Sequence, residues 1–337
     1  MKIAYFYQDE SEKDYFSKSL ESFEFDFIEG SIKDNPEYKN EEAEVLSIFV
    51  DSDIDASVMD RFPNLKFIAT RSTGFDHVDL EEAKKRGITV SNVPAYGENT
   101  VAEFTFALLL TLSRKIYNSY DRIREEGSFS QEGLKGFDLM NKTMGIVGVG
   151  NIGRHSIRMA KGFGMKVIAF DVHKDEDFAK EVGFEYVEFD ELLQTSDIIS
   201  LHVPLNPHTQ HLINKKNISK IKKGAYLINT SRGEVVETEA LVEALEKGIL
   251  AGAGLDVLEE ESFMGHEVDL LSEEHPNPDA LKTVLQNQYL IDHPQVVITP
   301  HNAFNTVEAI ERIFATTVDN LNSFESGQIV NVVGLKE

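Results

Sequence analysis

Short apolar runs alternate with polar, acidic segments over residues 1–95. The runs cover Lys2–Tyr7, Val45–Val50, Leu65–Thr70 and Ile88–Val93, and they are rich in the β-branched and aromatic residues that favour strands. Between them lie acidic segments with helical spacing of apolar residues, such as Leu80–Arg86. Because strands that alternate with helices form parallel sheets, this region is predicted to be an α/β unit.

The same alternation returns after residue 143. Strands are expected at 144–149, 165–170, 186–189, 198–203, 225–230, 252–257 and 296–300, with helical stretches between most of them. Repeated strand–helix pairs of this kind predict a doubly wound nucleotide-binding domain. The last helix, Val307–Phe324, is amphipathic and could return to the first unit.

One helix is predicted to be buried on all sides. Thr100 and Glu103 have the T-x-x-E spacing of a capping box, and the stretch Phe104–Leu112 is apolar on every face. A helix without a polar face must be covered all round, so it is expected to cross between two domains. The alternative is an ordinary core helix of one domain.

Residues 263–295 interrupt the alternation of strands and helices. This segment is acidic and helix-prone, and it contains Pro276, Pro278 and Pro294. It is therefore interpreted as an insertion into the second unit. The chain shows no internal repeat and no low-complexity tract.

The chain is long and strongly acidic. Its 337 residues are enough for two domains that each bury a core. Acidic residues number 58 against 33 basic ones, which gives a net charge of −25 at pH 7. The electrostatic field of this negative charge repels nucleic acid and anionic membranes, so neither is expected as a partner. It also repels anionic ligands, so any site for them needs local positive charge.

Cysteine is absent from the sequence. Disulfides, thiolate zinc sites and a cysteine nucleophile are therefore excluded, and no metal site is expected. The longest apolar stretch is far below the ~18 residues of a membrane span. The N-terminus turns acidic before a signal-peptide core could form, so a cytoplasmic location is expected.

A glycine-rich turn follows the predicted strand 144–149. Gly148, Gly150 and Gly153 form GxGxxG at the start of a helix, where free N–H groups favour a pyrophosphate. Gly148 allows the tight turn, Gly150 the close approach of the phosphates, and Gly153 the packing of helix on strand. Asp171 ends the next strand, 23 positions after Gly148, where a carboxylate binds the ribose hydroxyls and repels a 2′-phosphate. NAD is therefore predicted rather than NADP; the alternative is a glycine-rich turn with an ordinary surface Asp.

Three polar residues follow predicted strands of the second unit. Arg232, Glu261 and His301 come after strands whose carboxyl ends share one edge of the sheet, where ligands bind. An Arg can bind a carboxylate and polarise a carbonyl, an imidazole can transfer a proton, and a Glu can orient that imidazole and raise its pKa. Each residue also has an ordinary interpretation: a solvated Arg, a surface His, and one acid of an exposed acidic run.

Several fragments occur in a fixed order: RSTGFDHVDL, NVPAYGENTVAEF, GVGNIGR, LHVPLNPHT, INTSRGEVV, LDVLEEE and TPHNAF. Together they resemble the D-isomer-specific 2-hydroxyacid dehydrogenase family over roughly residues 45–330. The resemblance implies an α/β fold of two Rossmann-like or flavodoxin-like domains, with the NAD-binding domain (99–303) inserted into the substrate-binding domain (1–98 plus 304–337). It also implies a homodimer formed through the cofactor domain.

The resemblance assigns functions to individual residues. It implies that Arg232, Glu261 and His301 are catalytic, and the spacing of five positions from the Asp of LDV selects Glu261 over its acidic neighbours. Backbone N–H groups of Thr73 and Gly74 would hold the carboxylate of a small 2-oxo or 2-hydroxy acid. The implied cofactor-binding residues are Thr100, Gly148, Gly150, Asn151, Ile152, Gly153, Asp171, His202, Val203, Pro204, Thr209, Thr230, Ser231 and Asp256, the last of them near the nicotinamide amide.

Two features favour the D-lactate dehydrogenase branch of this family. The connection from Glu261 to His301 is long, at 40 positions, and Phe304 follows the histidine. Tyr96 and Phe304 would form an apolar wall that suits the methyl group of pyruvate and disfavours a phosphorylated chain. Ser262 departs from the pattern, because the family often has Pro there.

Other functions are compatible with the same motifs. Within the class they are a glyoxylate or hydroxypyruvate reductase and a 3-phosphoglycerate dehydrogenase. Outside enzymes, the same fold serves as an NADH-sensing corepressor, because fold alone does not fix function.

Overall fold

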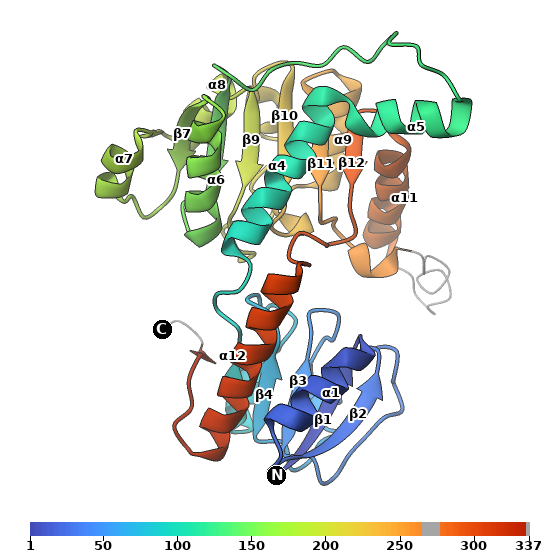
Figure 1. Ribbon diagram of the computed structural model, residues 1–337, viewed down its shortest axis with the longest axis vertical. Helices are drawn as coiled ribbons and strands as arrows, with labels where there is room; N and C mark the ends of the chain where they lie inside the picture. The colour runs from blue at the N-terminus through green and yellow to red at the C-terminus, as the bar shows by residue number, and fades with distance from the viewer. Residues whose placement is uncertain (265–276, 335–337) are drawn as a thin grey trace. The chain divides into compact units, whose positions relative to one another are not determined.

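The computed structural model describes residues 1–264 and 277–334, and it separates into two compact units (Figure 1). Unit 1 consists of Met1–Tyr96 together with Asn305–Glu337, and unit 2 of Gly97–Phe304. The second unit is thus inserted into the chain of the first. Within the described residues, every helix is too short or too polar to span a lipid bilayer.

Unit 1 is built on a six-stranded sheet in the order β13-β5-β4-β3-β1-β2. All neighbours are parallel except β13, which pairs antiparallel with β5. The strands are β1 (Lys2–Tyr7), β2 (Glu24–Glu29), β3 (Val45–Ile48), β4 (Phe67–Thr70), β5 (Thr89–Ser91) and β13 (Val332–Val333), and the helices are α1 (Glu10–Ser19), α2 (Ala56–Met59), α3 (Leu80–Lys85) and α12 (Val307–Glu325). The order β2-β1-β3-β4-β5 is that of flavodoxin-like folds.

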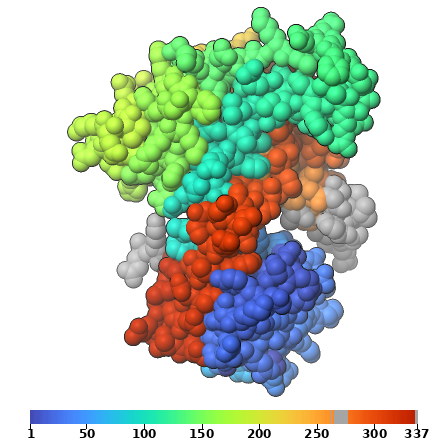
Figure 2. Space-filling model, in the orientation of Figure 1, coloured from blue at the N-terminus to red at the C-terminus, as the bar shows by residue number. Residues whose placement is uncertain are grey.

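Alternate residues of β1 enter two different cores. Ile3 and Tyr5 pack on one face with Phe16 of α1 and Leu321 of α12, whereas Ala4 and Phe6 pack on the other face with the residues around α2 and α3. This division follows from the period of two along a strand. Figure 2 shows α12 (red) lying against the N-terminal residues (blue) of the same unit. The prediction that the last helix returns to the first unit is therefore confirmed.

Sequence patterns predicted four of the five parallel strands of unit 1, and β2 was missed. Its sequence EFDFIE alternates acids with apolar residues at the edge of the sheet, and only Ile28 is buried. An edge strand buries less surface than a central one, so its apolar signal is weaker.

Unit 2 carries a seven-stranded, all-parallel sheet in the order β12-β11-β10-β9-β6-β7-β8. The strands are β6 (Thr143–Val147), β7 (Lys166–Phe170), β8 (Glu185–Tyr186), β9 (Ile198–Leu201), β10 (Ala225–Asn229), β11 (Leu250–Leu255) and β12 (Val296–Ile298). The strand order reverses between β6 and β9, as in Rossmann folds, and ligands bind at the carboxyl ends beside such a reversal.

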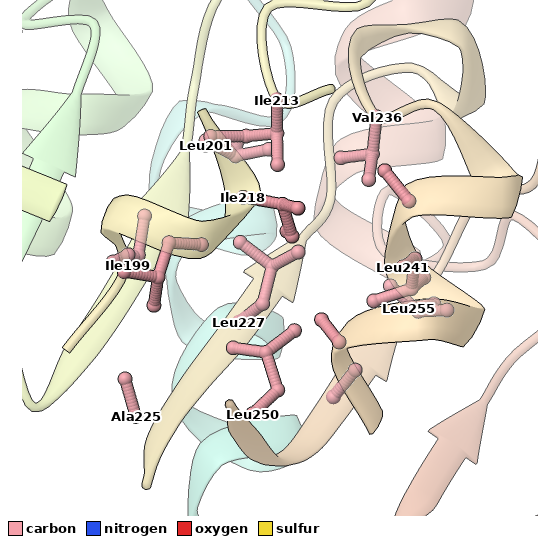
Figure 3. Close-up of a cluster of buried hydrophobic side chains, with 14 of the residues drawn as sticks. Ile199, Leu201, Ile213, Ile218, Ala225, Leu227, Val236, Leu241, Leu250 and Leu255 are labelled. Atoms are coloured by element: carbon pink, nitrogen blue, oxygen red, sulfur yellow. The ribbon is translucent and has the colours of Figure 1, made fainter. Parts of the chain in front are cut away.

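Helices cover both faces of this sheet, as the doubly wound prediction requires. They are α4 (Glu98–Arg114), α5 (Ile116–Glu126), α6 (Asn151–Gly162), α7 (Glu176–Val182), α8 (Phe189–Thr195), α9 (Thr238–Glu246) and α11 (Pro278–Asp292), with short 3₁₀ turns η1 (Ile218–Lys220), η2 (Gly233–Val235) and η3 (Glu261–Phe263). Figure 3 shows one of the two cores, in which Leu227 and Leu255 of the sheet meet Leu241 of α9.

Two predictions about α4 are wrong. The helix begins at Glu98 with Gly97 as its N-cap, so Thr100 already lies in the first turn and no side-chain capping bond forms. Glu103 instead accepts a hydrogen bond from Asn99 (3.0 Å). The helix also lies wholly in unit 2, where its apolar residues pack on α6 and on strands β10 to β12. It is a core helix of one unit.

Part of the segment interpreted as an insertion, residues 265–276, lies outside the described residues. The second half of the segment forms α11, which begins at Pro278 after the N-cap Asn277 and packs on α9 and β12. Proline at the first helical position has no N–H to leave unpaired, so it starts the helix rather than breaking it.

Candidate active site

The ends of three neighbouring strands in unit 2 carry the predicted catalytic residues. Strands β10, β11 and β12 are adjacent and parallel, and Leu255 at the end of β11 pairs with Asn229 on one side and Ile298 on the other. The loops that follow these strands therefore leave the sheet at one edge. They contain Arg232, Glu261 and His301.

The side chains of His301 and Glu261 form a hydrogen-bonded pair. The distance from His301 Nδ1 to Glu261 Oε1 is 2.7 Å, and the two side chains are 29% and 42% exposed. Burial acts to raise the pKa of Glu261, but His301, with the Leu258 N–H and the Arg232 charge, lowers it below its ordinary value. Glu261 is thus an ionised acceptor, so Nδ1 carries the proton of this bond. The other ring nitrogen, Nε2, is left to exchange a proton with a ligand.

The backbone at His301 is held in a left-handed conformation, with φ of 49°. Its N–H donates to the carbonyl oxygens of Asp256 (2.8 Å) and Thr299 (3.0 Å). The Asp256 carboxylate, 1% exposed, accepts from Thr299 Oγ1 (2.5 Å) and from the N–H groups of Asn302 (2.9 Å) and Ala303 (2.8 Å). Burial raises the pKa of Asp256 against the effect of these bonds. Asp256 therefore shapes the loop that presents His301, a function the sequence did not indicate.

Arg232 is half-buried in the loop that follows β10. Asn229 bridges this loop, because its Oδ1 accepts from Ser231 N–H (3.0 Å) and its Nδ2 donates to Arg232 O (2.8 Å). Gly233 lies directly against the next loop: a Cβ added there would be 2.0 Å from the carbonyl carbon of Leu258. Only glycine permits this approach, and it brings the Arg232 charge close enough to lower the pKa of Glu261.

The glycine-rich turn joins β6 to α6. Gly148 has φ of +94°, and an added Cβ would be 2.5 Å from His202 O; at Gly153 it would be 2.0 Å from Gly148 O. The packing of the chain itself therefore requires both glycines. At Gly150, by contrast, an added Cβ would meet no atom within 4 Å. Gly150 is also the N-cap of α6 and makes no side-chain capping bond, so a phosphate group fits the N–H groups of this turn.

Asp171 directly follows β7, beside the glycine-rich turn. Its Oδ2 accepts the Val149 N–H (2.6 Å) and its Oδ1 accepts the His173 N–H (2.8 Å). These two bonds fix the orientation of the carboxylate and leave further lone pairs as acceptors for hydroxyl groups. The donor and acceptor set of Gly150 and Asp171 thus fits a dinucleotide with free ribose hydroxyls.

The other predicted cofactor residues of unit 2 follow β9 and β10 or lie on α4 and α6. His202 Nε2 is 3.0 Å from Ser200 Oγ, and burial lowers the pKa of His202 to about 4, so the ring is neutral. Thr209 Oγ1 donates to Pro204 O (2.6 Å), and Thr230 Oγ1 is 3.0 Å from Thr105 Oγ1 of α4. Of the rest, Val203 and Ser231 follow β9 and β10, Thr100 lies on α4, and Asn151 and Ile152 begin α6.

Unit 1 contains the loop after β4, where Thr73 and Gly74 lie. Its carbonyl oxygens are engaged: Thr73 O accepts from Asn92 Nδ2 (2.8 Å), and Gly74 O accepts from Ser72 Oγ (2.6 Å). Among the described residues, no acceptor is found for the N–H groups of Thr73 and Gly74. Adjacent free N–H groups in a fixed loop are suited to bind an anion. Of the two predicted aromatic residues, Tyr96 belongs to unit 1 and Phe304 to unit 2.

Comparisons with known proteins agree with this geometry. Residues 106–303 match the model of the family described as D-isomer specific 2-hydroxyacid dehydrogenase, NAD binding domain. The chain is 37% identical to D-lactate dehydrogenase of Escherichia coli over 97% of its own length and 98% of that protein. It is 39% identical to glyoxylate reductase of Korarchaeum cryptofilum over 85% of its length and 80% of that protein.

A solved structure is similar over almost the whole chain. It is D-lactate dehydrogenase from Aquifex aeolicus complexed with NAD and lactic acid, with a TM-score of 0.88 and 36% identity over 99% of this chain and 100% of that one.

Proposed function

The chain belongs to the D-isomer-specific 2-hydroxyacid dehydrogenases, oxidoreductases that act on CH–OH groups, and from this we propose that it is an NAD-dependent D-lactate dehydrogenase. The reaction is the reduction of pyruvate by NADH and a proton to D-lactate and NAD⁺. The observation that carries the proposal is the His301–Glu261 pair at 2.7 Å, on the same sheet edge as Arg232.

We assign one chemical step to each of these side chains. Bound NADH supplies the hydride to C2 of the oxo acid. His301 Nε2 donates the proton to the carbonyl oxygen as its bond order falls, and Glu261 holds the ring with Nδ1–H toward the carboxylate. Arg232 binds the substrate carboxylate with its planar fork and polarises the carbonyl.

The assignment of NAD rests on the turn after β6 and on Asp171. The pyrophosphate is assigned to the N–H groups at the start of α6 near Gly150, and the adenosine ribose to the Asp171 carboxylate. A carboxylate there repels a 2′-phosphate, which supports NAD over NADP. The substrate carboxylate is assigned to the N–H groups of Thr73 and Gly74 as well as to Arg232.

Pyruvate is proposed because Tyr96 and Phe304 are aromatic, and apolar surface accommodates a methyl group better than a hydroxyl or phosphate. A glyoxylate or hydroxypyruvate reductase is the second candidate, since the glyoxylate reductase of Korarchaeum cryptofilum has a similar identity, 39% against 37% for the Escherichia coli D-lactate dehydrogenase, although over a smaller share of the chain. A 3-phosphoglycerate dehydrogenase has less support, because the aromatic residues Tyr96 and Phe304 disfavour a phosphorylated chain. An NADH-sensing corepressor has less support, because the chain has the three side chains that the reaction needs, Arg232, Glu261 and His301.

A substrate panel tests the proposal. NADH oxidation is measured with pyruvate, glyoxylate, hydroxypyruvate, 3-phosphohydroxypyruvate and larger 2-oxo acids, with NADPH alongside, and the chirality of the product is determined. We expect NADH-specific turnover of pyruvate to D-lactate. A preference for glyoxylate would show that the protein is a glyoxylate reductase instead. NADH binding without turnover of any acid would favour the NADH-sensing corepressor.

We further propose that two copies associate through unit 2. Helix α5 has no buried residue, and Ile116, Tyr117, Tyr120 and Ile123 are 48–58% exposed along one face. Exposed apolar faces of this kind mark protein interfaces. Light scattering after gel filtration should give a dimer, and the double variant Tyr117→Glu/Tyr120→Glu should give a monomer that still binds NADH. A monomeric native protein would refute the proposal.

A further inference from the structure

A second histidine–glutamate pair lies beside the first. Glu259, two residues before Glu261, accepts from His211 Nε2 (2.5 Å), and its side chain is 13% exposed. Its other carboxylate oxygen accepts both the N–H (2.7 Å) and the hydroxyl (2.6 Å) of Thr238. Its backbone carbonyl accepts from Asn287 Nδ2 (2.7 Å). A single acid is thus bound by four donors from three separate segments.

These bonds connect the loop after β11 to three elements of unit 2. His211 lies in the segment after β9, close to the predicted cofactor residue Thr209; Thr238 is the first residue of α9; and Asn287, fully buried, lies on α11. The N-cap of α9, Glu237, makes no side-chain capping bond, so the Glu259 carboxylate takes that function from another segment. Any shift of Glu259 would therefore break bonds to several elements at once.

The loop after β11 needs such anchoring because it contains a residue in an unfavourable backbone conformation. In this loop Glu260 has φ of 55°, and in the segment after β9 His211, the partner of Glu259, has φ of 49°; both lie in a region that is unfavourable for residues other than glycine. Residues held there persist only where the surroundings determine them. Glu260 stands between the anchored Glu259 and Glu261, so the anchor fixes the direction in which Glu261 leaves the loop.

We infer that Glu259 is a positioning residue: bound by His211 and Thr238, it holds Glu261 at hydrogen-bonding distance from His301. The side-chain bonds of Glu259 in the described part of the chain go to His211 and Thr238 and not to Glu261 or His301, so Glu259 acts through the loop. The inference rests on the proposed reductase activity, in which Glu261 orients the proton donor. The inference gives each acid of the sequence EEE its own function. Glu261 binds His301, Glu259 binds His211 and Thr238, and Glu260 connects the two in the chain.

The test compares Glu259→Gln with Glu260→Gln, which removes the same charge one position along the chain. A Gln at 259 keeps one acceptor oxygen but presents an NH₂ group to His211 or to Thr238, so one anchor is lost. We expect kcat for pyruvate reduction to fall about 10-fold in Glu259→Gln, with the dissociation constant of NADH within about 2-fold of the native value. Glu260→Gln should retain native kcat. His211→Asn, which suits the positive φ and removes the imidazole, should give a smaller loss and provides the test if Glu259→Gln does not fold.

A second measurement does not depend on turnover. In protein labelled with ¹⁵N-histidine, NMR follows the Nδ1–H resonance of His301, which reports the bond to the Glu261 carboxylate, and Glu261→Gln defines the full effect of losing that carboxylate. The resonance in Glu259→Gln should move a large part of the way toward its position in Glu261→Gln, while Glu260→Gln should not move it. Equal behaviour of Glu259→Gln and Glu260→Gln in both measurements would overturn the inference, as would a loss confined to NADH binding. If the native protein reduces no oxo acid, the proposed function fails while the NMR comparison still decides the position of Glu261.

Discussion

The position of His301 is fixed by its backbone as well as by its ring. The N–H of this residue donates to Asp256 O, the ring donates to Glu261, and the Asp256 carboxylate caps the two residues that follow. A left-handed residue costs about 1–3 kcal/mol, and these bonds offset that cost. The ring is thereby held before any substrate arrives, which lowers the reorganisation needed during the reaction.

Replacing His301 by Gln removes the proton donor but keeps a polar side chain of similar length. We expect kcat for pyruvate reduction to fall by about 10²–10⁴, the range for a lost acid–base group. NADH binding, measured by fluorescence titration, should stay native and serves as the control for folding. Turnover close to the native value would exclude His301 as the proton donor.

Replacing Arg232 by Lys keeps the charge and removes the planar fork. An ammonium group cannot bind a carboxylate through two parallel bonds, so we expect KM for pyruvate to rise about 10-fold or more while kcat changes less. Steady-state kinetics at saturating NADH measure both. If KM stays native, the substrate carboxylate is bound elsewhere.

At the scale of single residues, sequence patterns predicted the candidate catalytic side chains but not the residues whose hydrogen bonds hold the loops in place. Arg232, Glu261 and His301 lie within about six residues of the ends of β10, β11 and β12, and a strand end is visible in the sequence. Asp256 shapes the His301 loop through bonds to residues more than forty positions away, and Asn92 binds Thr73 from another strand end. Such contacts depend on the order of strands in the sheet, which local patterns do not contain.

At the scale of elements, three asparagines connect the C-terminal helix to the loop after β4. Asn331 Nδ2 donates to Asn320 Oδ1, Asn320 Nδ2 to Asn92 O, and Asn92 Nδ2 to Thr73 O, each at 2.8 Å. Asn320 of α12 is fully buried and Asn92 is 7% exposed. The loop to which we assign the substrate carboxylate is thus held by α12, although the whole of unit 2 separates them in sequence.

Replacing Asn320 by Ala should loosen this loop. We expect KM for pyruvate to rise about 3–10-fold with KM for NADH unchanged, because only the carboxylate-binding loop loses support. The free energy of unfolding should fall by about 1–3 kcal/mol, since buried polar partners lose a hydrogen bond. Chemical denaturation and steady-state kinetics measure the two effects.

Thr317→Val is the matched control for this change. Thr317 is equally buried one turn earlier in α12, but its hydroxyl donates only to Ile313 O of the same helix. It should lower stability without changing KM for pyruvate. A similar KM change in both variants would mean that general loosening of unit 1, rather than the asparagine chain, is responsible.

Most helices and strands could be predicted from the sequence, and the predictions that failed did so for physical reasons. Central strands are apolar on both faces, so β1, β3, β4, β6, β7, β9, β10 and β11 appear as clear runs. The edge strand β2 and the start of α4 at Gly97 do not, because an edge buries little and a glycine N-cap has no side chain to form the expected bond. The edge strand β8 (Glu185–Tyr186) is shorter than the predicted strand 186–189, because Phe189 already begins α8.

At the scale of the molecule, the stability of unit 2 should depend on pH through His202. Its folded pKa is about 4, against an ordinary value of 6.5. Between these values the unfolded chain binds a proton that the folded chain does not, so stability is complete above pH 6.5 and falls as pH drops toward 4. The loss from this group is at most about 3 kcal/mol, since one pKa unit corresponds to about 1.4 kcal/mol.

Urea unfolding of the protein without cofactor between pH 7.5 and 4.5 measures this dependence. His202→Gln should flatten the acid side of the curve, whereas His173→Gln, at an exposed histidine, should leave the curve parallel to that of the native protein. Parallel curves for both variants would show that other groups cause the acid loss.

The insertion of unit 2 into unit 1 has a consequence for synthesis on the ribosome. Residues 1–96 leave the ribosome first, but one face of their sheet, with Ile3, Tyr5 and Phe67, is covered by α12 near the end of the chain. Unit 2 is continuous and can complete its core while translation proceeds, whereas the first segment must wait with an uncovered apolar face. The nascent N-terminal segment is therefore the part of this protein with the greatest need for a chaperone, and ribosome stalling within unit 2 would expose it longest.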